Sequence, residues 1–210
     1  YKLKKHVTYN MKNDRLLIII FSLITIISCT QKSSEQNEII IDSEKSKKWN
    51  LPELNAKVKI PKEYKLTFND NDGFYFQAHK YDENNILLAE ISFGRIEGEF
   101  KKENIMKALK EAENGIIEQF SSIKQVDYQT TFLGKEKIGD LELSQLRGIV
   151  EFNNFNVVFD GKFHSFTTPI LLDEKNRIMI SAIIRDSERL DNKTSIGIEL
   201  INIIQSIKQK

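Results

Sequence analysis

Residues 102–122 read KENIMKALKEAENGIIEQFSS, and this stretch decides the fold class. Its apolar residues recur every three or four positions, which places them on one face of an amphipathic helix. That face consists of Ile105, Leu109, Ala112, Ile116 and Phe120. Gly115 lies inside the predicted helix, where glycine costs roughly 1 kcal/mol relative to alanine, so we expect another element to pack closely there.

Patterns typical of β-strands lie on both sides of this long central helix. Residues 56–98 and residues 126–186 alternate between apolar and polar side chains, with short Asn, Asp and Gly turns between the runs. Short turns imply antiparallel pairing. A second helical face closes the chain at Ile196, Leu200, Ile203 and Ile207. Strands and helices are thus segregated, which predicts an α+β fold with an antiparallel sheet covered by helices, in one globular domain over residues 51–210.

The N-terminal residues have a different composition. A short basic segment precedes residues 16–27, of which ten are apolar. A membrane-spanning helix needs about 20 apolar residues, whereas a run of about twelve matches the core of a secretory signal. The only cysteine of the chain, Cys29, directly follows the small residue Ser28.

The stretch ITIISC, residues 24–29, resembles the lipobox of bacterial lipoprotein signal peptides. The resemblance implies that residues 11–28 are a signal peptide, that cleavage falls between Ser28 and Cys29, and that Cys29 carries the lipid. Buried acyl chains contribute about 0.8 kcal/mol per methylene, so several chains anchor a protein firmly to a membrane. The alternatives are a buried core helix with an inert cysteine and an uncleaved signal anchor. The run has no polar face and is short for a membrane span, which disfavours both.

These features predict a lipid anchor in the bacterial cell envelope, on either its periplasmic or its outer side. Residues 29–50 are rich in Ser, Lys, Glu and Gln, which predicts a flexible tether after the lipidated cysteine. The apolar run at residues 39–41 is also compatible with an early strand. Residues 1–10 precede Met11, and we expect them to be an upstream extension outside the fold.

The order of elements resembles the PsbP-like family over residues 52–208. The resemblance rests on that order, on KIPKEYKL at residues 59–66, and on RIMISAIIRD and IGIELINIIQSIK at residues 177–186 and 196–208. The family includes a photosystem II extrinsic subunit, a nuclear-import cofactor and bacterial lipoproteins of the DcrB type. The resemblance implies a sheet sandwiched between helices, an α/β/α sandwich, and an accessory or interaction role without catalysis.

The composition disfavours or excludes several classes of protein. The whole chain has a net charge of +1, but five basic residues and one acidic residue lie in residues 1–28, so the remainder is weakly acidic. A weakly acidic body argues against nonspecific nucleic-acid binding. A single cysteine excludes an intramolecular disulfide and a cysteine-based zinc cluster. No phosphate-binding loop, dinucleotide fingerprint or serine elbow is present, so we expect neither an enzyme nor a cofactor.

Four side chains form a candidate interaction surface: Trp49, Tyr75, His79 and Tyr81. The last three alternate along the predicted strand 74–82, and aromatic residues are enriched at interaction hot spots. The alternative is that they cover the sheet beneath a helix. A metal site formed by His79, His164 and a carboxylate would require adjacent strands, and isolated strand histidines are more often structural or surface residues, so we predict no metal.

We therefore expect a lipid-anchored binding or accessory module with an unidentified envelope protein as its partner. A small-ligand carrier or sensor, with a pocket between sheet and helix, is the alternative. An envelope hydrolase is the least favoured reading, because no nucleophile and base can be identified.

The variant Cys29→Ser tests the anchor because it removes the sulfur that would carry the lipid. We expect metabolic labelling with a fatty-acid analogue to be lost and the protein to be unprocessed or soluble. The neighbouring Thr30→Ser variant is the control. A Cys29→Ser protein that still matured and stayed membrane-bound would contradict the lipobox interpretation.

Overall fold

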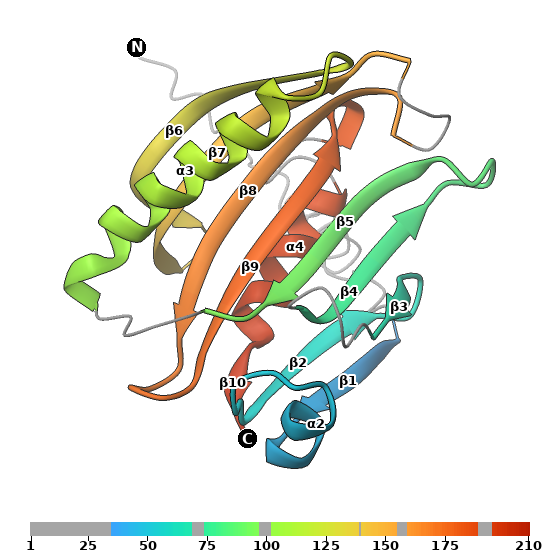
Figure 1. Ribbon diagram of the computed structural model, residues 1–210. Helices are drawn as coiled ribbons and strands as arrows, with labels where there is room; N and C mark the ends of the chain where they lie inside the picture. Colours follow the sequence, from blue (N-terminus) through green and yellow to red (C-terminus); the bar gives the residue numbers. More distant parts are fainter. Residues whose placement is uncertain (1–34, 69–73, 97–101, 139, 155–158, 189–194) are drawn as a thin grey trace, which may run out of the picture. The chain divides into compact units, whose positions relative to one another are not determined.

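The computed structural model describes residues 35–68, 74–96, 102–138, 140–154, 159–188 and 195–210. The predicted signal peptide and Cys29 lie outside the described residues. The folded unit is Gln36–Lys210, and its centre is a seven-stranded antiparallel sheet (Figure 1). In spatial order its strands are β3 (Lys65–Thr67), β4 (Phe74–Tyr81), β5 (Leu87–Gly94), β9 (Arg177–Arg185), β8 (Gly161–Leu171), β7 (Leu141–Phe152) and β6 (Val126–Ile138).

Helices pack on both faces of this sheet. The predicted central helix is α3 (Ile105–Ser121), which lies across β6, β7 and β8 on the face called the front here (Figure 1). The C-terminal helix α4 (Ser195–Ser206) lies on the opposite face, the back. The sequence of the central strand β9 explains why the back of the sheet is covered. Every second residue of this strand is apolar and buried in the back core: Ile178, Ile180, Ala182 and Ile184. The predicted α+β sandwich is confirmed.

The folded unit begins earlier than the sequence analysis placed it. Strand β1 (Gln36–Ile41) pairs with β2 (Ala56–Pro61), and β2 also pairs with β10 (Lys208–Gln209), so these strands form a second, three-stranded sheet. Between β1 and β2 lies the short helix α2 (Ser43–Lys48). Residues 36–50 are therefore part of the fold and not of a flexible tether.

The apolar run at residues 39–41 explains this difference. Ile39 and Ile41 lie opposite Val58 and Ala56, and their burial outweighs the polar composition around them. The Asp42 carboxylate then accepts a hydrogen bond from the Lys45 backbone N–H at 3.0 Å, which caps α2.

A polar cluster ties α4 to the edge of the large sheet. Glu199 of α4 accepts hydrogen bonds from Lys80 Nζ at 2.7 Å and from the Tyr64 hydroxyl at 3.0 Å. Burial and the neighbouring Glu199 carboxylate raise the pKa of Tyr64 far above its usual range. These partly buried, charge-assisted hydrogen bonds fix the position of α4 along β4.

Two glycines have opposite surroundings. A Cβ atom at Gly148 of β7 would lie 2.6 Å from the ring of Tyr128, which crosses β7 from β6. A Cβ atom at Gly115 of α3 would meet no atom within 4 Å. The expectation of close packing at Gly115 is therefore wrong, whereas Gly148 is a glycine that packing requires.

Substitution of these two glycines should change stability in opposite directions. Gly148→Ala should lower the free energy of unfolding by roughly 1–3 kcal/mol, because the Tyr128 ring must move. Gly115→Ala should raise it by roughly 0.5–1 kcal/mol, because alanine restricts the unfolded chain and meets open space. Urea denaturation measures both. Equal effects at the two sites would contradict the register of β6 against β7.

Candidate functional site

Tyr75 is buried, although the sequence pattern placed it on an exposed face. The pairing of β4 with β5 shifts by one residue between Phe74 and Phe76, so Tyr75 is the extra residue of a β-bulge. Tyr75 joins the back core, is 1% exposed and donates its hydroxyl hydrogen to the Pro52 carbonyl at 2.8 Å. Burial raises the pKa of Tyr75 to about 12. Its assignment to an interaction surface is therefore wrong.

His79 and Tyr81 lie together on the front of the sheet near its β3 edge. Their rings stack with centroids 6.2 Å apart, and Lys65 Nζ lies 5.0 Å from the centre of the Tyr81 ring. His79 Nε2 lies 3.4 Å from the carboxylate of Glu90 on β5. No helix of the described chain lies over this half of the front face, where β4, β5 and β9 run (Figure 1).

Trp49 lies apart from these two residues. It follows α2 and stacks on Phe68, with ring centroids 5.8 Å apart. Phe68 is 47% exposed, and Trp49 packs against the back core. The predicted four-residue surface is thus divided between the front and the back of the sheet.

The two strand histidines cannot share a metal ion. His79 is paired with Glu90 on the front, whereas His164 lies opposite Ile184 on the back. There, His164 Nε2 lies 2.6 Å from Asp186 Oδ1. Within the described residues, no three His, Cys, Asp or Glu side chains are placed to hold a metal.

A groove of about 430 Å³ runs between α3 and the open half of the front face. Its floor contains a polar row in register across three strands: Ser92, Ser181 and Thr167. Aromatic rings form much of its rim, namely Phe74, Phe120, Tyr128 and Phe152. We call this site the α3 groove. It combines an apolar lining with a few convergent polar groups, which is typical of small-molecule sites.

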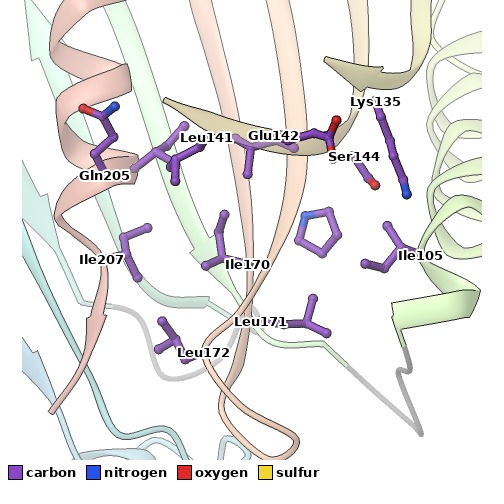
Figure 2. Close-up of a pocket in the computed structure, with 13 residues that line it drawn as sticks. Ile105, Lys135, Leu141, Glu142, Ser144, Ile170, Leu171, Leu172, Gln205 and Ile207 are labelled. Carbon is purple, nitrogen blue, oxygen red and sulfur yellow. The ribbon is translucent and has the colours of Figure 1, made fainter. Parts of the chain in front are cut away.

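A second cavity, of about 460 Å³, opens where β7 and β8 separate (Figure 2). Their pairing ends at Leu146↔Thr167, yet β7 stays paired with β6 to Leu141 and β8 stays paired with β9 to Leu171. Residues 141–145 and residues 168–171 therefore each present one strand edge to the gap. We call this gap the fork. Leucine and isoleucine side chains from β7, β8 and the end of α4 surround it, with Lys135 and Glu142 beside them.

Pro169 gives a physical reason for the fork. Proline has no backbone N–H and interrupts a ladder on at least one side of a strand. The ladder to β9 continues through Pro169↔Met179, whereas the ladder to β7 ends two residues earlier. Thr168 Oγ1 instead donates to the Ser144 carbonyl at 2.8 Å across the apex. This site was not predicted from the sequence, although the proline inside the run FTTPILL at residues 166–172 was a signal for it.

Comparisons with known proteins bear on the fold. No protein-family model matches the sequence, and no curated protein matches it significantly. The structure is similar to that of cyanobacterial PsbP (CyanoP) from Synechocystis sp. PCC 6803, with a TM-score of 0.50 over 86% of this chain and 96% of that chain. The sequence identity is 8%, so the likeness concerns the fold alone. The chain has a PsbP-like fold, as the order of elements predicted.

Tyr75→Phe and Tyr81→Phe separate a structural tyrosine from a surface one. Tyr75→Phe should lower the free energy of unfolding by about 1 kcal/mol, because a hydrogen bond to Pro52 is lost. Tyr81→Phe should change it by less than about 0.5 kcal/mol, as is usual for surface positions. Thermal and urea unfolding provide the measurement. A larger loss of unfolding free energy for Tyr81→Phe than for Tyr75→Phe would contradict the assignment of Tyr75 to the core and of Tyr81 to the surface.

Proposed function

We propose that this chain is a lipid-anchored protein of the bacterial cell envelope that acts as a non-enzymatic binding module for a protein partner. The observation that carries the proposal is the fork, where β7 and β8 stop pairing and, beyond the hydrogen bond from Thr168 to Ser144 at its apex, each presents a backbone edge to the gap. Unpaired strand edges are templates for an additional extended chain, and backbone hydrogen bonds to such edges are a recurrent mode of peptide recognition.

The dimensions of the fork suit a short segment of a partner. At about 3.3 Å per residue, the unpaired stretches can accompany an extended chain of roughly four residues. Leu143, Ile170 and Leu171 line the space beside that path and would receive apolar side chains of the partner. Side chains of a strand point alternately to its two faces. Every second side chain of the bound segment would therefore point through the fork toward the back core.

The anchor would keep this module close to the membrane. The lipobox resemblance of residues 24–29 supports a lipid on Cys29, and β1 begins at Gln36. The six residues between them span at most about 20 Å when fully extended. The partner is therefore expected at the membrane surface or in the membrane-proximal layer of the envelope.

A second function, that of a small-ligand carrier or sensor, is favoured by one observation. The α3 groove lies between the sheet and a helix and has the mixed polar and apolar lining of ligand sites. The two functions use different places in the fold, so one protein can serve both.

Site-specific photo-crosslinking in intact cells tests the partner proposal. A benzoylphenylalanine at Leu171, whose side chain lines the fork, should yield a discrete protein adduct (Figure 2). The same group at Ile117, which is 44% exposed on α3, is the matched control and should yield none. Combination with Cys29→Ser should abolish the adduct, because the module would leave the membrane surface. Absence of an adduct at Leu171, or identical adducts at both positions, would contradict the proposal.

A further inference from the structure

The α3 groove has an acidic lining. Among its lining residues in the described chain, Glu90 is the only charged one. The last turn of α3 contributes Gln119 and Phe120 to the groove and contains no basic residue. A helix C-terminus carries about half a negative elementary charge, which is unneutralised by side chains of that turn. The carboxylate and the helix end therefore both favour a positive ligand.

Glu90 has hydrogen-bonding capacity to spare. Its Oε1 accepts from Gln77 Nε2 at 3.2 Å and from Ser92 Oγ at 3.4 Å, and its Oε2 lies 3.4 Å from His79 Nε2. A carboxylate accepts about four hydrogen bonds, and charge-assisted ones are usually about 2.7–2.9 Å long. These three contacts are long for a carboxylate, so an ammonium group would form the shorter and stronger interaction.

The rim of the groove suits the apolar part of such a ligand. The Phe120 ring lies 5.8 Å from the Tyr128 ring and 6.4 Å, edge to face, from the Phe152 ring. Ile116 and Ile183 complete an apolar surface next to these rings. Aromatic faces attract cations and pack well against rings and aliphatic chains.

The floor adds neutral hydrogen-bonding groups and no positive charge. Ser92 and Thr167 are 5% and 9% exposed, and Thr167 Oγ1 lies 3.3 Å from Ser181 Oγ. This contact is at the long end for two hydroxyl groups. A hydroxyl or carbonyl of a ligand can therefore hydrogen-bond here without displacing a strong internal pair.

We infer that the α3 groove binds a small organic cation: an amine whose ammonium group contacts Glu90 and whose aromatic or aliphatic body packs against Phe120 and Ile183. The volume of about 430 Å³ is in the range of small-molecule sites. This inference rests on the second function proposed above, to which it gives a ligand class, and it is independent of the fork.

Three probes of one shape and different charge test the inference: phenethylammonium, 2-phenylethanol and phenylacetate. Each probe is titrated into the isotopically labelled full chain carrying Cys29→Ser. The backbone amide shifts of the Gln36–Lys210 unit are followed by NMR. Phenethylammonium should shift the amides of Glu90, Ser92 and Phe120 with a dissociation constant on the order of several millimolar. The alcohol should bind roughly fivefold more weakly and the acid more weakly still.

Two variants separate the charge from the fold. Glu90→Gln keeps the shape of the side chain and should reduce the affinity for the amine to that for the alcohol. Gln119→Lys adds a cation to an exposed position of the groove wall and should weaken amine binding even if Glu90→Gln does not fold. Ile117→Lys, on the same helix but outside the groove, should leave the affinity unchanged.

The outcomes are distinct. Selectivity for the amine that Glu90→Gln or Gln119→Lys removes supports the inference. Three results would overturn it: equal affinity for the three probes, shifts confined to the fork, or no shifts at a phenethylammonium concentration about ten times the expected dissociation constant. If the alcohol and the amine bound with equal affinity, the groove would still be a ligand site, as the carrier function requires. The preference of that site for a cation would then be excluded.

Discussion

The antiparallel pairing of β5 with β9 holds this fold together. It joins Glu90 to Ile183 and Ser92 to Ser181, residues that are about ninety positions apart in the chain. On one side of the pair lie β3 and β4, and on the other lie β8, β7 and β6. Without it, the two strand groups would separate, the back core would open, and the floor of the α3 groove would not exist. Long-range pairing of this kind is slow to form, because the chain loses the entropy of closing a long loop before the stabilising contacts form.

The two candidate sites arise where the large sheet is incompletely covered and where it is incompletely paired. The helix α3 crosses β6, β7 and β8, which leaves the front of β4, β5 and β9 open and forms the α3 groove along its margin (Figure 1). The fork arises inside the sheet, where Pro169 ends one ladder while the neighbouring ladders continue. A PsbP-like fold thus offers two kinds of recognition here, through side chains in the groove and through backbone edges in the fork.

The layered architecture followed from the sequence because α3 and β9 carry strong periodic patterns. The periodicity of residues 105–121 matches the helix that forms, and the alternation in residues 177–185 matches the two faces of β9. Residues 36–50 were assigned to a tether because their charged composition was given more weight than the isoleucine run of β1, which was compatible with an early strand. Tyr75 was misassigned because a one-residue bulge reverses the alternation, and a two-residue period cannot reveal a bulge. The groove and the fork depend on which strands adjoin, which local patterns do not specify.

Amide hydrogen exchange along β7, measured residue by residue by NMR, tests the existence of the fork most directly. In residues 146–152, β7 is paired on both sides, and all its amides should exchange slowly. In residues 141–145, only the amides directed toward β6 have a partner strand, so every second amide should exchange much faster. Uniform protection along the whole of β7 would show that β7 and β8 stay paired to their ends, and it would contradict a backbone-edge binding site.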